Sequence, residues 1–179
     1  MIRYVGAVND TYDWFLLADV ANINRLKEQR NLGTNLLEVL TTTEIGDMVA
    51  AEGILIPLMG IDNLPYTIVF NVNEPSTFTQ AGLTPTHQQD GYVIEIISGQ
   101  ITLFTVPYLI DWSAHSPRLL AATSTTHPCA PLANGWYRLQ INVGDMPDED
   151  CTSVIEFCLQ PVAQAPEFSA DVNYQFALE

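Results

Sequence analysis

Basic residues are scarce in this sequence. The 179 residues include six lysines and arginines against 21 aspartates and glutamates, a formal net charge of −15, and Lys27 is the only lysine. An excess of negative charge does not define a fold, but it repels phosphate backbones and anionic membrane surfaces and attracts basic proteins. We therefore expect no direct contact with nucleic acid or with a membrane, and we expect a basic protein partner.

Cysteine is also rare. Cys129, Cys151 and Cys158 are the only three, and no two of them have the CxxC spacing. An odd number without that spacing does not form a disulfide framework. Cys151 and Cys158 are seven residues apart, so on one continuous strand they would face opposite sides of the sheet. The sequence therefore predicts free thiols, buried or half-buried, in a reducing compartment.

Long hydrophobic runs are missing as well. The longest apolar stretch, Gly53 to Ile61, is interrupted by Pro57. It falls well short of the roughly 18 residues that suggest a membrane-spanning helix. The first residues, Met1-Ile-Arg-Tyr, do not place a basic region before an apolar core, as a secretory signal peptide would. These features predict a cytoplasmic protein.

The motifs that usually accompany catalysis are absent too. The sequence has no GxSxG, no GxGxxG and no phosphate-binding glycine loop, and His87, His115 and His127 form no zinc-ligand spacing. His127 and Cys129 are close in sequence, but Pro128 imposes an extended backbone between them. We therefore expect no enzyme, no catalytic residue, no cofactor and no metal, while a site assembled from distant loops stays open.

Hydrophobic residues are plentiful. They make up 47% of the chain, whereas charged residues make up only 15%, against roughly 25% in typical globular chains. A chain of this length and composition can bury a sizeable core, and no linker-like segment divides it. We expect a single domain over residues 1–179.

Alternating apolar and polar residues predominate from Ile45 onward, which predicts a mainly β fold. Ser98-Gly99 separates two such stretches at the spacing of a β-hairpin. Turns marked by proline and glycine separate the others, as in an antiparallel β-sandwich, which is the fold we expect. The predicted strands are Tyr12–Asp19, a pair or one bent strand over Met48–Met59, Tyr66–Val72, Tyr92–Ile97, Gln100–Val106, Trp136–Val143, Thr152–Gln160 and the tail Asn173–Leu178.

One or two short helices are expected near the N-terminus. Ile23–Arg30 is the more helix-like stretch, and Asn35–Leu40 is a second, shorter one. Proline-rich polar segments predict loops over Asn73–Asp90 and over Ser113–Asn134, the latter with a short strand at Leu119–Thr123.

Acidic residues cluster on one predicted turn. Four of the six basic residues lie within the first 30 positions, whereas Leu139 to Glu179 contains eight acids and no lysine or arginine. An anionic patch can attract a basic partner, although a solvated turn is the alternative interpretation of such a cluster. The candidate partner-binding residues are Asp145, Asp148, Glu149 and Asp150 on this turn, followed by Glu74, Asp90 and Asp111.

The order of segments resembles a known family. An aromatic strand, Trp14–Asp19, precedes a helical insert, and Ala50–Ile56 and Ser98–Leu103 follow. Leu132–Leu139 then resembles a strand pattern Leu-x-x-Gly-x-Tyr-Arg-Leu of small bacterial β-sandwich proteins. These are the competence protein J type, which inhibit a partner nuclease, and related immunity proteins. The proline-rich loop at Ser113–Pro131 is bulkier than the family's pattern.

The resemblance implies an immunity protein or inhibitor that neutralises a basic toxin or nuclease and has no catalytic residues. Two alternatives stay open. A module for a small ligand or carbohydrate could use loop aromatics such as Tyr92, Tyr108 or Trp112. A structural subunit of a phage or secretion assembly is the other. An enzyme with a site built from loops ranks last.

Overall fold

The computed structural model describes residues 1–6, 12–61, 65–121, 127–147 and 153–178. Their strands form two sheets, one of five strands in the order β1-β4-β9-β8-β5 and one of four in the order β3-β2-β6-β7. The strands are β1 Ile2–Gly6, β2 Trp14–Ala18, β3 Leu55–Met59, β4 Tyr66–Val72, β5 His87–Ile96, β6 Gln100–Thr105, β7 Cys129–Pro131, β8 Gly135–Asp145 and β9 Ser153–Val162.

The two sheets stack on one another and share a hydrophobic core. Alternate residues of each strand point inward, so Leu17 of β2, Phe70 of β4 and Phe157 of β9 belong to the same buried cluster. Phe70 and Phe157 stack with their ring centroids 5.4 Å apart. The alternation along Tyr66–Val72 and Trp136–Val143 therefore predicted β4 and the central part of β8 correctly.

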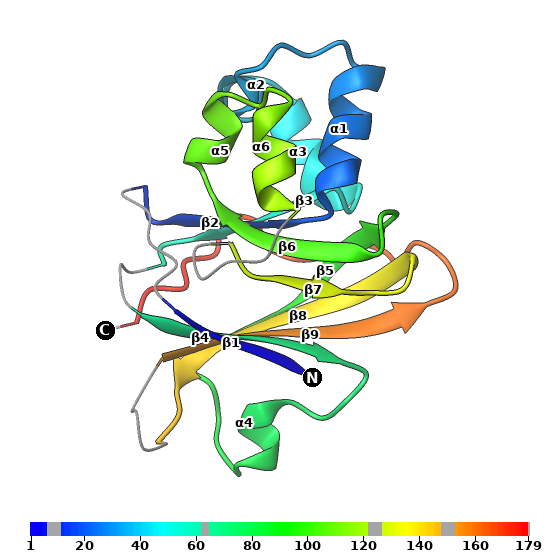
Figure 1. Ribbon diagram of the computed structural model, residues 1–179. Helices are drawn as coiled ribbons and strands as arrows, with labels where there is room; N and C mark the ends of the chain where they lie inside the picture. The colour runs from blue at the N-terminus through cyan, green and yellow to red at the C-terminus, as the bar shows by residue number, and fades with distance from the viewer. Residues whose placement is uncertain (7–11, 62–64, 122–126, 148–152, 179) are drawn as a thin grey trace.

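Helices cover the outer face of the four-stranded sheet. The helices are α1 Val20–Gln29, α2 Leu36–Thr42, α3 Ile45–Ala51, α4 Thr77–Gln80, α5 Pro107–Ile110 and α6 His115–Leu120. Figure 1 shows all of them on that face except α4, which lies on the opposite side of the molecule, below the five-stranded sheet. A second core fills the space between helices and sheet, with Leu26, Trp112 and Phe104 among its members.

Several helices replace predicted strands or loops. Met48–Met59 is not a strand pair, because α3 ends at Ala51 and only Leu55–Met59 is extended. Val49 and Ala50 are buried, Val49 in the second core, so burial against the sheet outweighs local β preference. Ser113–Asn134 contains α6, whose Leu120 is fully buried in the same core.

The predicted hairpin around Ser98-Gly99 is wrong. β5 belongs to the five-stranded sheet and β6 to the other, so this turn carries the chain between the sheets. The fully buried Asp19 side chain fixes the turn, because it accepts hydrogen bonds from the backbone N–H groups of Ile97 and Ser98, each at 2.7 Å. The same carboxylate caps α1 through Ala21 N–H at 2.9 Å.

The sheets are also not purely antiparallel, because β4 and β9 pair in parallel. The tail predicted as a last strand makes only an isolated bridge between Gln175 and Met59 among the described residues. The coarser prediction is confirmed: the fold is mainly β, with two sheets and a few short helices. In the described part of the chain, no helix has the length and apolarity that a membrane crossing requires.

Candidate functional site: a groove on the five-stranded sheet

A groove with a volume of about 790 Å³ crosses the outer face of the five-stranded sheet. Helices cover the outer face of the other sheet, whereas α4 packs on this one only near Val69 and Val154. The groove lies on the part of the face that α4 leaves open. Its described lining residues are Asn73, Glu74, Pro75, Asp90, Gly91, Tyr92, Arg138, Leu139, Gln140, Cys158, Leu159, Gln160, Glu167 and Ser169.

The floor of the groove is polar because of strand alternation. Leu139 and Leu159 are paired neighbours on β8 and β9 and point into the core. The residues on either side of them therefore point outward. Arg138 and Gln160 form one outward pair and are both exposed.

One wall is the turn that follows β4. Asn73 has a left-handed backbone conformation, φ 56°, and its N–H donates to Leu159 O at 2.9 Å. This bond holds the turn against the end of β9. Glu74 is exposed on the turn, with Oε1 3.7 Å from the Met1 amino nitrogen.

The opposite wall begins at a β-bulge in β5. The pairing of β5 with β8 shifts between Gln89 and Tyr92, so Asp90 and Gly91 together oppose one residue of β8. Gly91 has a φ of 83°, which glycine adopts without strain. The bulge leaves the Asp90 side chain exposed at the rim of the groove.

The C-terminal segment completes this wall. Ser169 N–H donates to Gly91 O at 3.0 Å, which places Glu167 beside the bulge. Further along, Tyr92 donates from its hydroxyl to Asp171 O at 3.1 Å, and Phe176 is fully buried in the core between the sheets. The segment is thus anchored at several points although it forms no regular strand.

The buried carboxylate of Glu156 holds the segment that forms the first wall, after β4. Glu156 is fully buried and accepts hydrogen bonds from Asn71, Ser76, Asn142 and the backbone N–H of Thr77, at 2.5–3.1 Å. Burial alone would raise the pKa of Glu156, but these four donors outweigh it and bring the pKa below 4.5. The charged side chain therefore ties α4 and the turn before it to β9 and β8.

Cys158, on the groove floor, is not a reactive thiol. Burial raises its pKa to about 12, and the negative charge of Glu156 and the hydrogen bond with it add to the effect. Because the thiolate is the nucleophile, a thiol with this pKa is inert near neutral pH. Cys158 and the buried Cys129 are both free, as predicted, while Cys151 lies outside the described residues.

The structure separates the predicted acidic residues. Glu74 and Asp90 line the groove from opposite walls. Asp145 ends β8, seven residues from Arg138 and so about 23 Å along the strand, and accepts a hydrogen bond from Ser153 at 2.7 Å. Asp111 follows α5 in the helical layer. Asp148, Glu149 and Asp150 lie outside the described residues.

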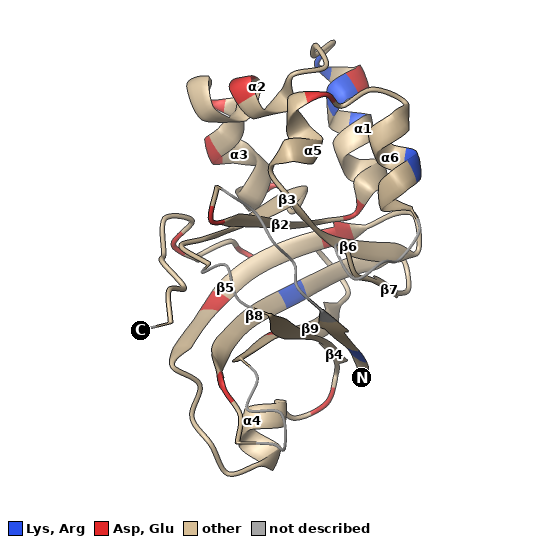
Figure 2. Ribbon diagram, turned by 60° about the vertical axis from the view of Figure 1, so that its left-hand side comes forward, with Lys and Arg blue, Asp and Glu red and all other residues tan. Residues whose placement is uncertain are grey.

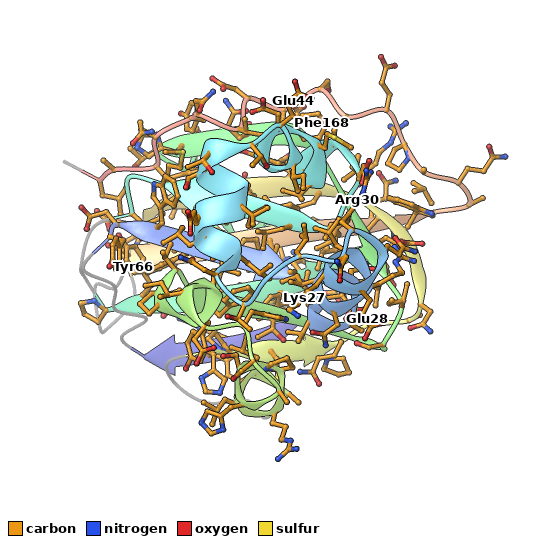
Figure 3. The ribbon with its side chains drawn as sticks, turned by 90° about the horizontal axis from the view of Figure 1, so that it is seen from above. Lys27, Glu28, Arg30, Glu44, Tyr66 and Phe168 are labelled. Carbon is orange, nitrogen blue, oxygen red and sulfur yellow. The ribbon has the colours of Figure 1, made fainter. Side chains whose placement is uncertain are left out.

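Two charged groove residues, Arg138 and Glu167, were not predicted from the sequence. Arg138 is the only basic residue of β8 and stands apart from the basic residues of α1 and α6, as Figure 2 shows. Seen from the helical side, Lys27, Glu28 and Arg30 lie around the end of α1 (Figure 3). The alternation along β8 indicates that the Arg138 side chain points outward from the sheet. Nothing in the sequence placed Glu167 beside β5, because that contact depends on the path of the tail.

Two of the three aromatic residues named for a ligand module are buried. Tyr92 and Trp112 are 1% and 2% exposed, and Tyr108 is half-buried. The indole N–H of Trp112 is used internally, donating to Asn24 Oδ1 at 2.8 Å. Among the described residues, no group of three or more His, Cys, Asp or Glu side chains could hold a metal ion.

The fold belongs to the class of two stacked β-sheets, of five and four strands, with helices over one outer face and α4 on the other. No protein-family model and no curated protein sequence matches the chain. Among solved structures, the chain is similar to the crystal structure of ComJ, inhibitor of the DNA degrading activity of NucA, from Bacillus subtilis. The TM-score is 0.53 at 10% identity, over 90% of this chain and 96% of that one. The resemblance predicted from the sequence is confirmed as a likeness of fold.

Proposed function

We propose that this protein is a non-enzymatic inhibitor or immunity protein that binds and neutralises a nuclease. The observation that carries the proposal is the fold likeness to ComJ, which extends over nearly the full length of both chains. ComJ inhibits the DNA degrading activity of NucA. Because the likeness covers 90% of this chain and 96% of ComJ, it supports a shared mode of action.

Charge supports the same proposal. A nuclease binds a polyanion and therefore needs a basic substrate channel. A chain with a net charge of −15 is suited to such a channel, and charge complementarity accelerates association and helps to select the partner. The free thiols of Cys129 and Cys158 support the further proposal that the protein acts in the cytoplasm.

Three observations count against two of the other functions, an enzyme and a carbohydrate-binding module. The inert Cys158 thiol and the lack of a nucleophile–base motif in the sequence argue against an enzyme. The burial of Tyr92 and Trp112 leaves Tyr108, which is half-buried, as the only one of the three named aromatics with exposed surface, and this weakens the carbohydrate-binding alternative.

The test begins with capture of the partner. The purified protein is immobilised, exposed to a lysate of its source cells at low salt and eluted at high salt, and the eluate is assayed for degradation of DNA and RNA. We expect nuclease activity in the eluate, abolished when about one equivalent of free protein is added. An eluate without nuclease activity, or with activity that the added protein leaves unchanged, would overturn the proposal.

A further inference from the structure

We infer that the groove on the five-stranded sheet is the surface that receives the nuclease. The occupant is one segment of the nuclease that carries basic side chains to the two walls and a carboxylate to Arg138 on the floor. The inference rests on the proposed function and adds to it the docking surface and the charge pattern of the partner.

Among the described residues, the groove is a part of the sheet surface that no helix covers. Both faces of the four-stranded sheet are buried, one in the inter-sheet core and the other under helices. On the five-stranded sheet, α4 covers Val69 and Val154, and the described residues leave Arg138 and Gln160 exposed on the same face. A polar floor of this kind suits a partner whose groups can hydrogen-bond to it.

The size of the groove suits a single segment. Its walls stand on β4 and β5, which are separated by β9 and β8. Three inter-strand spacings of about 4.8 Å give about 14 Å between the strands that carry the walls. One helix or one loop of a partner, about 10–12 Å across with its side chains, is of this size.

The charges of the groove have a fixed arrangement. Glu74 stands on one wall, Asp90 and Glu167 stand on the other, and Arg138 is on the floor. Three carboxylates against one guanidinium and the Met1 amino group, 3.7 Å from Glu74 Oε1, leave the groove with a net attraction for lysine and arginine side chains. The walls can thus take the place of the phosphates that a nuclease binds.

Arg138 sets the pattern apart from a merely acidic surface. It is exposed, and none of the ion pairs between described residues involves it. A guanidinium offers up to five N–H donors and is suited to a bidentate pair with a carboxylate. Nucleases that act through metal ions carry carboxylates among their basic residues, so a cation within an acidic groove matches the mixed charge of such a site.

The walls are held in place before any partner binds. Glu156 fixes the turn that carries Glu74, and the bond from Ser169 to Gly91 fixes the segment that carries Glu167. Pre-organised walls lower the entropic cost of association. The groove is therefore suited to tight binding as well as to electrostatic attraction.

The test compares charge reversals inside and outside the groove. The groove variant is Glu74→Lys with Glu167→Lys, and the matched control is Glu44→Lys with Asp47→Lys. All four residues are exposed, and the control pair lies at the start of α3 in the helical layer. Both variants carry the same net charge, and circular dichroism with thermal unfolding verifies that each is folded.

Inhibition of the captured nuclease is measured for each variant at low and at high salt. We expect the groove variant to raise the inhibition constant at least about tenfold at both salt concentrations, which is about 1.4 kcal/mol. The control should change it by less than about twofold, and less still at high salt, because only long-range attraction is altered. Equal effects of the two variants would overturn the inference.

Arg138→Glu distinguishes a specific contact of Arg138 with the nuclease from a general attraction of the groove for basic groups. The substitution makes the protein more acidic, so we expect tighter binding of an octalysine peptide, measured by calorimetry, but weaker inhibition of the nuclease. Tighter inhibition of the nuclease would overturn the role given to Arg138. If the wild-type protein inhibits the nuclease and all groove variants inhibit it equally well, the inference about the groove is wrong but the proposed function stands. Wild-type protein that inhibits no nuclease would overturn the proposed function itself.

Discussion

Gly91 and Ser169 are in contact through their backbones, with Ser169 N–H donating to Gly91 O at 3.0 Å. A Cβ on Gly91 would come within 2.5 Å of Ser169 Oγ and 2.8 Å of Ala170 N. The bulge of β5 and the C-terminal segment can therefore meet only because residue 91 is a glycine. The contact links the shape of a strand to the position of Glu167, which is far away in the sequence.

We expect Gly91→Ala to displace the C-terminal segment. The alanine would be strained by its positive φ and would also collide with Ser169. The control is Gly82→Ala, because Gly82 has a similar φ of 71° but nothing within 4 Å of its Cβ position. The control should lose about 1–2 kcal/mol of the free energy of unfolding, and Gly91→Ala should lose more, as measured by urea denaturation. Equal losses would show that the contact with Ser169 is unimportant.

Asp19 should be among the most sensitive polar positions. Its carboxylate accepts from Ala21, Ile97 and Ser98, and an asparagine would turn an amide donor toward some of these N–H groups. We expect Asp19→Asn to cost about 2–4 kcal/mol of the free energy of unfolding. Asn35→Ala, which removes only an exposed cap of α2, should cost about 1 kcal/mol. A smaller loss at Asp19 than at Asn35 would contradict this prediction.

Glu156 should make stability depend on pH. Its pKa is lower in the folded protein than its ordinary value of 4.5, so its stabilising contribution is complete above about pH 5 and is lost as the pH falls through the folded pKa. Glu156→Gln removes the charge and should cost about 1–3 kcal/mol at neutral pH.

The measurement is urea denaturation of both proteins from neutral to acidic pH. The difference in the free energy of unfolding between wild type and Glu156→Gln should narrow as the pH falls. Glu167→Gln, at an exposed position, serves as the control and should change little at any pH. A difference at position 156 that is independent of pH would mean that the carboxylate is not charged in the folded protein.

Cys158 should resist alkylation in the folded protein. With a pKa of about 12, its thiolate fraction at pH 8 is about 10⁻⁴. We expect iodoacetamide to modify Cys158 at least about a hundredfold more slowly in the native protein than in urea, as followed by mass spectrometry of the peptide that contains it. Native and denatured rates of similar size would show that the thiol is neither buried nor influenced by Glu156.

The sequence predicted those elements whose pattern arises from burial on one face. Alternation predicted the central part of β8, and alternation with β-branched residues predicted β4, because one face of each strand packs into the inter-sheet core. The helix predicted over Ile23–Arg30 corresponds to α1, Val20–Gln29, although its helical periodicity in the sequence is poor. Predictions failed where local pattern and tertiary packing disagree, as in α3, where Val49 and Ala50 pack in a helix.

For the candidate site, the sequence predicted an excess of acidic side chains and identified two of the acidic residues that line the groove. Glu74 and Asp90 were named as candidates, and they line one groove from opposite walls. The acidic turn favoured from the sequence extends beyond Asp145 into residues outside the described part of the chain. The role of this turn in partner binding stays a prediction, as does that of Glu74, Asp90 and Asp111.

The sequence by itself determined that the protein is acidic, rich enough in apolar residues to form a core, and mainly β, because the first two properties depend on residue counts and the third on short-range alternation. Only the tertiary structure decided that the turn at Ser98 joins two sheets, that β4 and β9 are parallel, and that Arg138 and Glu167 share a groove. Each of these depends on contacts between residues distant in sequence, such as Asp19 with Ser98 or Ser169 with Gly91. Such contacts leave no periodic signal in a single chain, since the partner of a buried polar group is chosen by the packed fold as a whole.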